Sequence, residues 1–175
     1  MSLTNTSFIL RPWTAKDAES LAWHANNPKV SGMLRDIFPY PYTIEDAKRW
    51  ITDILPIEYG LFYAIEINGK AVGGIGVNYK TDIYALNGEI GYWLGEAYWG
   101  GGIMTRALQK VIIEVFSTTA VNRIYAEVFD INKSSAKVLV KCGFSLEATL
   151  KNAIIKNEQI MDVHIYVKYK NSGIV

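Results

Sequence analysis

The chain has 175 residues, of which half are hydrophobic and 20% are charged. This composition excludes intrinsic disorder, and the length predicts one domain over residues 1–175. The 18 Lys and Arg residues nearly balance the 17 Asp and Glu residues, so the net charge of +1 predicts no nucleic-acid partner. A single cysteine, Cys142, excludes an intrachain disulfide and a multi-cysteine zinc site, and we expect no metal.

The sequence shows no sign of a membrane segment or a targeting segment. No stretch approaches the roughly 18 uninterrupted apolar residues of a membrane-spanning helix. Residues 1–11 also lack the basic region and the apolar region of a signal peptide. We therefore expect a cytoplasmic protein that has no membrane partner.

The predicted elements follow one another along the whole chain. A first strand ends at Pro12, and Thr14 begins a helix. Asn68-Gly69 predicts a tight hairpin turn, and hydrophobic residues at helical spacing follow three glycines. The expected strands cover residues 8–11, 63–67, 71–77, 87–94 and 123–128 and two stretches within 144–168, and the expected helices cover residues 14–25, 44–55, 103–117 and 134–142.

The order of these elements predicts the fold class. An antiparallel meander of strands is followed by a helix, a strand and another helix, and the chain ends in two more strands. We therefore expect an α/β fold, in which a mixed sheet carries helices on both faces. This arrangement differs from a doubly wound dinucleotide-binding fold.

The most informative segment is Gly100-Gly101-Gly102, which lies between a strand and a long amphipathic helix. Glycine lets the backbone approach a ligand closely, and a helix N-terminus offers unpaired N–H groups and a partial positive charge. The segment thus suits a pyrophosphate, although a flexible loop explains the glycines as well. It lacks the Gly-Lys-Ser/Thr of a Walker motif, and Thr105 stands where the dinucleotide fingerprint requires glycine.

Residues 99–104 resemble motif A of the GCN5-related N-acetyltransferases, which reads Gln/Arg-x-x-Gly-x-Gly/Ala. Gly100 and Gly102 match, whereas Trp99 and Met104 depart from the usual residues. A tryptophan before the glycines is common in the branch that acetylates ribosomal proteins at an N-terminal alanine or serine. The segment is therefore similar to that branch of the family.

A second family segment, Asn-x-x-Ser followed by Gly-Phe, resembles Asn132, Ser135 and Gly143-Phe144. It lies at the expected distance after motif A, and the resemblance covers nearly the whole chain. The resemblance implies a single N-acetyltransferase domain. Its expected core is a twisted, mostly antiparallel mixed sheet of about six to seven strands with helices on both faces.

The resemblance also implies acetyl-CoA as the cosubstrate. Backbone N–H groups from Gly100 to Thr105 are expected to hold the pyrophosphate. An N–H near Trp93 or Leu94 is expected to stabilise the acetyl carbonyl oxygen, and Lys137 either meets the phosphates or belongs to a solvated helix face. The expected cofactor-binding residues are Trp93, Leu94, Trp99, Gly100, Gly101, Gly102, Ile103, Met104, Thr105, Asn132, Ser135 and Lys137.

Direct attack of a primary amine on the thioester needs a base for the amine and a proton for the departing thiolate. The resemblance implies Glu127 as the base, with Glu89 and then Asp162 as alternatives, although an ion-pair partner explains each carboxylate as well. The resemblance to the ribosomal-protein branch also implies Ser135 as the proton donor. Cys142 precedes a helix-terminating glycine and is expected to be structural, which disfavours a ping-pong mechanism.

Two positions lack a catalytic side chain that is found elsewhere in the family. Leu139 stands where one branch of the family has a tyrosine that acts as the general acid. Ile154 stands at about the position where the ribosomal-protein branch has a catalytic Glu. Together with Trp99 and Met104, these departures motivate an alternative function, a CoA-binding sensor or scaffold without turnover.

An aromatic cluster before the second helix, Phe38, Tyr40 and Tyr42, is expected either to line the acceptor cleft or to pack in the core. An aromatic wall suits a peptide N-terminus or a small apolar amine. The expected function is therefore acetyl-CoA-dependent N-acetylation of a protein N-terminus or a small-molecule amine, by a monomer or a homodimer.

Overall fold

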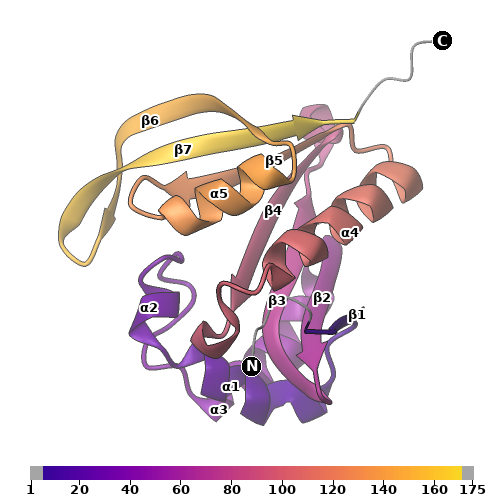
Figure 1. Cartoon of the computed structure of the whole chain (residues 1–175), viewed down its shortest axis with the longest axis vertical. Coiled ribbons are helices and arrows are strands. Elements are labelled where there is room, and N and C mark those ends of the chain that lie inside the picture. The colour runs from indigo at the N-terminus through magenta and orange to yellow at the C-terminus, as the bar shows by residue number, and fades with distance from the viewer. Residues whose placement is uncertain (1–5, 171–175) are drawn as a thin grey trace.

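The computed structural model describes residues 6–170 of the chain. Seven strands in these residues form one sheet with the order β1-β2-β3-β4-β5-β7-β6 (Figure 1). β4 and β5 are parallel, and the other neighbouring strands are antiparallel. The strands are β1 (Ile9–Arg11), β2 (Gly60–Ile67), β3 (Lys70–Tyr79), β4 (Asn87–Leu94), β5 (Arg123–Phe129), β6 (Ser145–Lys156) and β7 (Gln159–Tyr169).

Helices cover both faces of the sheet. α4 (Ile103–Thr118) and α5 (Lys133–Lys141) pack on one face, which we call the α4–α5 face. α1 (Ala18–Ala25) and α3 (Ile44–Arg49) pack on the opposite face, the α1–α3 face. The predicted mixed α/β class and the mostly antiparallel sheet are therefore confirmed.

The two helix layers bury two separate hydrophobic clusters against the sheet. On the α4–α5 face, Leu108 and Leu139 are fully buried against β-strand residues such as Ile124. On the α1–α3 face, Leu21 and Trp13 belong to the second cluster. Burial of one such leucine stabilises the fold by about 1.5–3 kcal/mol.

The first helical region differs from the prediction. The structure adds α2 (Pro28–Ser31) after residues that were expected to end the helix. The Asn27 side chain accepts a hydrogen bond from the Lys29 N–H, and Pro28 fits the first turn, where its missing N–H costs nothing. An Asn-Pro pair therefore begins a new helix here.

The second predicted helix, residues 44–55, is regular only in α3. It continues as a π-helical turn (Trp50–Ile54) and a 3₁₀ turn (Leu55–Ile57). Pro56 lies in the first turn of this 3₁₀ segment, where its missing N–H is tolerated. Further 3₁₀ turns lie at Ala15–Asp17, Asp82–Tyr84 and Glu96–Tyr98.

β4 and β5 pair only where they begin, through residues 87–89 and 123–125. Beyond that point the two strands diverge, and the part formed by β5, β7 and β6 turns away from β1–β4 (Figure 1). We call the region between residues 90–94 of β4 and 126–129 of β5 the β4–β5 opening. Among residues 6–170, one edge of β4 therefore has no strand partner here, in the middle of the sheet.

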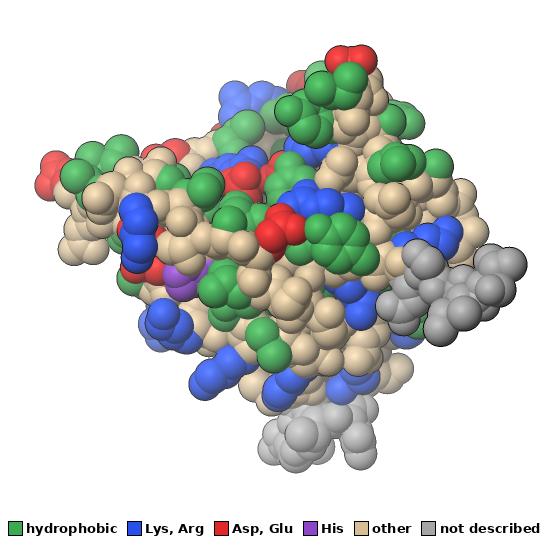
Figure 2. Space-filling view, turned by 90° about the horizontal axis from the view of Figure 1, so that it is seen from above, with side chains coloured by type: hydrophobic (Ala, Val, Ile, Leu, Met, Phe, Trp, Pro, Cys, Tyr) green, Lys and Arg blue, Asp and Glu red, His purple; other side chains and the backbone are tan. Residues whose placement is uncertain are grey.

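Among the described residues, no helix is both long and apolar enough to cross a lipid bilayer. Side chains of both charge signs lie among hydrophobic ones on the face shown in Figure 2.

Candidate active site

The β4 edge at the β4–β5 opening presents backbone N–H groups. The Gly95 N–H donates to the Val72 carbonyl oxygen at 2.8 Å, so the backbone amide of Gly95 points toward β3. Backbone directions alternate along a strand, and therefore the amide of Leu94 points away from β3, into the opening. The same alternation directs the amide of Tyr92 into the opening, whereas that of Trp93 faces Gly74 of β3.

The glycine turn continues from this edge into α4. Gly100 and Gly102 have φ angles of +79° and +69°, which is a left-handed conformation that favours glycine. Gly102 is the N-cap of α4 and supplies no capping side chain, so the first amides of the helix have no side-chain partner there. The side chains of Ile103 and Met104 are buried in the core, which leaves only their backbone facing the turn.

Two side chains hold this turn in place. The Trp99 indole N–H donates to the Leu94 carbonyl oxygen at 2.7 Å, which closes the segment between β4 and the glycines. The Arg106 guanidinium donates to the carbonyl oxygens of Gly101 and Thr6 at 3.2 and 2.8 Å. The Trp99 side chain thus stabilises the turn through a hydrogen bond to its backbone.

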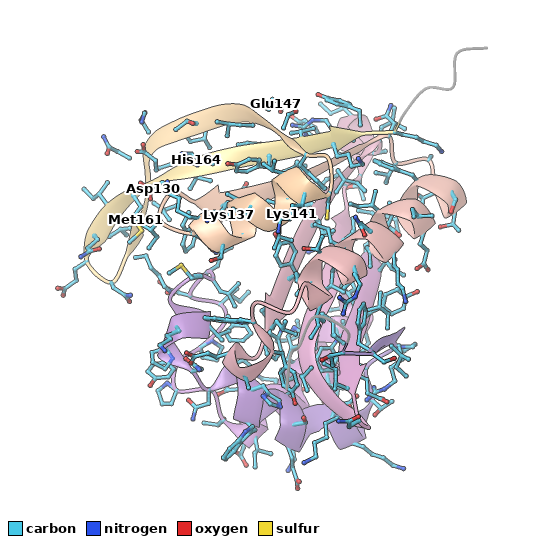
Figure 3. All side chains as sticks on the ribbon, viewed as in Figure 1. Asp130, Lys137, Lys141, Glu147, Met161 and His164 are labelled. Carbon is cyan, nitrogen blue, oxygen red and sulfur yellow. The ribbon has the colours of Figure 1, made fainter. Side chains whose placement is uncertain are left out.

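α5 lies across the opening from β4 on the α4–α5 face. The Asn132 side chain caps the helix by accepting a hydrogen bond from the Ser135 N–H at 3.1 Å. The Ser135 hydroxyl lies 2.8 Å from the Tyr92 hydroxyl, and either can donate. Burial raises the pKa of Tyr92, so its hydroxyl stays protonated. Lys137 is exposed on α5 (Figure 3).

The α1–α3 face of the opening carries two carboxylates. Ile90, Tyr92 and Leu94 of β4 pack toward the α4–α5 face, so Glu89 points to the opposite face. On β5, Ala126 and Val128 are in the α4–α5 core, which places Glu127 on the same face as Glu89.

Arg35, from the segment between α2 and α3, bridges the two carboxylates. Its Nη2 lies 2.5 Å from Glu89 Oε1 and 2.8 Å from Glu127 Oε2. Lys80 Nζ pairs with the other Glu89 oxygen at 2.6 Å. Glu89 is therefore held by two cations, whereas Glu127 is held by one and is more exposed.

These contacts separate the two candidate bases electrostatically. Burial alone would raise the pKa of Glu89. The hydrogen bonds and charges of Lys80 and Arg35 outweigh burial and hold that pKa below its usual value. A base held by two cations accepts a proton less readily.

The aromatic residues before α3 divide between packing and exposure. Phe38 packs against Trp93 and Tyr42, with ring centroids 5.6 and 4.8 Å apart. Tyr42 is buried in the core of the α1–α3 face, whereas Tyr40 is more than half exposed. Phe38 links this cluster to β4 beside the opening.

The remaining sequence candidates have structural partners. Asp162 pairs with Lys151 at 2.6 Å and accepts the Asn152 N–H at 2.9 Å. Cys142 is buried, its thiol donates to the Thr105 carbonyl oxygen at 3.5 Å, and burial raises its pKa. Within residues 6–170, no group of three metal-ligating side chains comes together.

Sequence reasoning missed three residues of this site, namely Arg35, Lys80 and Tyr92. Arg35 lies 54 and 92 residues from its two partners, and no local pattern relates such positions. Tyr92 had a detectable signal, because it shares a strand face with Leu94 and points toward the layer of the following helices.

Comparison with known proteins assigns the family. The acetyltransferase (GNAT) domain model matches residues 7–145. The chain therefore belongs to the GNAT acetyltransferases, the family that its glycine turn and its Asn132–Ser135 segment resemble. It is an enzyme of the N-acetyltransferase class.

Two curated relatives cover different shares of the chain. The ribosomal-protein-serine acetyltransferase of Escherichia coli (strain K12) is 36% identical over 114 residues, which span 65% of this chain and 63% of that protein. The putative ribosomal N-acetyltransferase YdaF of Bacillus subtilis (strain 168) is 28% identical over 176 residues, with 93% of this chain and 91% of that protein covered.

Solved structures share the fold over nearly the whole chain. The microcin C7 self-immunity acetyltransferase MccE, in complex with acetyl-CoA and AMP, has a TM-score of 0.80 and 28% identity, and 96% of this chain and 94% of that chain are covered. The ribosomal L7/L12 acetyltransferase RimL, in complex with coenzyme A, has a TM-score of 0.84 at 22% identity, with 95% and 96% covered.

Proposed function

We propose that this chain transfers the acetyl group of acetyl-CoA to a primary amine at the β4–β5 opening. One observation carries the proposal. A carboxylate, Glu127, and a hydroxyl pair, Tyr92 and Ser135, flank the same opening from opposite faces of the sheet. Acyl transfer to an amine needs a proton acceptor and a proton donor on the two sides of the reacting carbonyl.

The cofactor side of the proposal rests on backbone groups. The turn from Gly100 to Thr105 has the left-handed glycines and the uncapped helix N-terminus that suit a pyrophosphate. The amide of Leu94, which points into the opening, suits the acetyl carbonyl oxygen, and that of Tyr92 suits the same part of the cosubstrate. Acetyl-CoA supplies the activated acetyl thioester. Asn132, the N-cap of α5, and Lys137, within α5, lie on the cofactor side of the opening.

Glu127 is the base that the charges favour. Only its Oε2 is engaged by Arg35, and no described residue bonds Oε1. Glu89 has both oxygens engaged by cations. In the proposed reaction Glu127 takes a proton from the attacking amine, the new C–N bond forms, and the C–S bond breaks.

Ser135 is the proposed proton donor to the departing thiolate. In the arrangement in which the Ser135 hydroxyl accepts the proton of the Tyr92 hydroxyl, the serine proton is free to be donated. Because burial keeps Tyr92 protonated, the phenol can in turn return a proton to Ser135. This pair supplies an acidic group although Leu139 stands where another branch has a tyrosine.

The proposed acceptors are a protein N-terminus or a small-molecule amine. The curated relatives named above are a ribosomal-protein-serine acetyltransferase and a putative ribosomal N-acetyltransferase, which supports a protein N-terminus. Ile154 stands in β6 at about the position of the catalytic Glu of that branch, and this departure keeps a small-molecule amine as the second acceptor class. We further propose a cytoplasmic location.

The test is release of free CoA from acetyl-CoA in the presence of peptides with free N-termini, amino acids, polyamines and aminoglycosides. The expected result is amine-dependent release, with the acetylated product seen by mass spectrometry. Silence across all four groups, together with tight binding of acetyl-CoA, would instead support a CoA-binding sensor or scaffold.

A further inference from the structure

The strongest unexplained feature is the position of Arg35. It comes from a segment outside the regular elements, yet one nitrogen of its guanidinium contacts carboxylates on both strands of the β4–β5 opening. The neighbouring Asp36 binds Lys156 at the end of β6 at 2.6 Å. Two adjacent residues thus fix this segment to the opening and to the β6–β7 hairpin.

Part of the hydrogen-bonding capacity of this cluster is unused. A guanidinium has five N–H donors, and only the Nη2 of Arg35 is engaged by the described residues. The side chain is 58% exposed, so its remaining donors are accessible. Glu127 Oε1 likewise has no hydrogen-bond partner among residues 6–170. A free cationic donor and a free carboxylate oxygen therefore lie on neighbouring groups.

The charge balance of the cluster argues against a polycationic acceptor. Glu89 and Glu127 carry two negative charges, and Arg35 and Lys80 carry two positive charges. A site for a polyamine needs an excess of negative charge, which these four side chains do not provide. They suit a ligand that presents an ammonium or amine beside a hydrogen-bond acceptor.

We infer that Arg35 determines acceptor specificity by donating to a carbonyl or carboxylate oxygen beside the amine, while Glu127 Oε1 receives the amine. This inference rests on the proposed function and names its substrate class, the α-amino carbonyl compounds. A peptide N-terminus and a free α-amino acid share that chemistry. An alkylamine lacks the oxygen and loses the contact with Arg35.

The experiment compares three matched acceptors: trialanine, alanine and isopropylamine, in which a methyl group replaces the carboxylate of alanine. Steady-state CoA release is measured for the wild type, Arg35→Gln and Arg35→Lys. Because each amine is compared with itself across variants, their different basicities cancel. Arg49→Gln is the matched control, since Arg49 is an exposed arginine with one carboxylate partner on α3.

The expected result is a loss of about tenfold or more in kcat/KM for trialanine or alanine in Arg35→Gln, mainly through KM. Isopropylamine also loses the ion pair between Arg35 and Glu127 but no contact of its own, so its loss should be at least about threefold smaller. Arg35→Lys should recover part of the loss for trialanine or alanine. The acceptor with the larger loss shows whether the site recognises a peptide N-terminus or a free amino acid. An equal loss for all three amines, or no loss for trialanine and alanine, would overturn the inference.

A binding measurement separates this inference from the proposed function. Calorimetric titration of trialanine and isopropylamine into the CoA complex reports recognition without turnover. If no amine is acetylated, the proposed function fails. In that case Arg35-dependent binding of trialanine still supports the inference, and binding that ignores Arg35→Gln, or absent binding, overturns it.

Discussion

The two sides of the β4–β5 opening are formed by different kinds of chemical group. The cofactor side uses backbone groups: the amide of Leu94, the left-handed glycines Gly100 and Gly102, and the first turn of α4. The acceptor side uses charged side chains, of which Arg35 and Glu127 are far apart in the sequence. A cosubstrate shared by a family can be held by groups that every residue has, whereas acceptor choice depends on which side chains the chain carries.

The largest expected effect lies on the acceptor side. Glu127→Gln keeps the size of the side chain but removes the proton acceptor, so kcat should fall on the order of 10²-fold or more. Acetyl-CoA affinity should stay unchanged, because the residue lies on the opposite face from α4 and α5. Steady-state kinetics and CoA binding measure the two quantities.

Glu89→Gln is the control for this prediction. Glu89 has both oxygens paired with cations, so its loss should lower kcat less than the loss of Glu127. A nearly normal Glu127→Gln enzyme beside an inactive Glu89→Gln enzyme would transfer the base to Glu89. Two active variants would indicate deprotonation through water or before binding.

The next effect tests the hydroxyl pair that joins β4 to α5. Ser135→Ala removes a hydrogen bond to a developing thiolate, which is worth about 1.5–3 kcal/mol and corresponds to roughly a tenfold or larger loss in kcat. Tyr92→Phe should give a smaller loss, because Ser135 keeps its own proton. A larger loss in Tyr92→Phe than in Ser135→Ala would make the phenol the direct donor.

The cofactor side should respond to backbone strain rather than to charge. Gly102→Ala forces a side chain into a left-handed conformation at φ +69°, which costs about 1–2 kcal/mol. Thermal unfolding should show a Tm lowered by about 2–8 °C, and acetyl-CoA should bind more weakly. Gly91→Ala is the matched control, since Gly91 is exposed on β4 and a Cβ there meets nothing within 4 Å. Equal destabilisation of both variants would contradict the role of the turn.

The smallest effect concerns stability in acid. The pKa of Glu89 is lower in the folded protein than its usual value, so its contribution to stability is present above about pH 4.5. That contribution disappears as the pH falls through the folded-state pKa. The stability difference between wild type and Glu89→Gln should therefore shrink below about pH 4.5, as measured by urea unfolding from pH 7 to 3. A constant difference across this range would contradict the pairing of Glu89 with Lys80 and Arg35.

The same contrast explains what the sequence could predict. Asn68-Gly69 and the glycines before α4 act locally through φ angles, so the hairpin, the turn and the order of elements were predictable. α2 was missed because Asn27-Pro28 both ends one helix and begins another. Arg35 was missed because its contacts depend on how a loop folds back over two distant strands.

The two candidate bases, Glu89 and Glu127, also show what sequence alone leaves undetermined. Glu89 and Glu127 were both identified from the sequence, but their order rested on resemblance alone. The structure adds a physical reason, because the number of cations beside each carboxylate differs. Such a count requires the positions of Lys80 and Arg35 in space.

The most direct test of the two-sided account is one calorimetric comparison of CoA binding. The wild type is compared with a variant that combines Arg35→Gln, Glu89→Gln and Glu127→Gln, which removes three of the four charges on the acceptor side. Because backbone groups hold the cofactor, the combined variant should bind CoA within about twofold of the wild type, a difference of less than about 0.5 kcal/mol. A loss of CoA affinity of tenfold or more in a variant whose circular dichroism is native would contradict it.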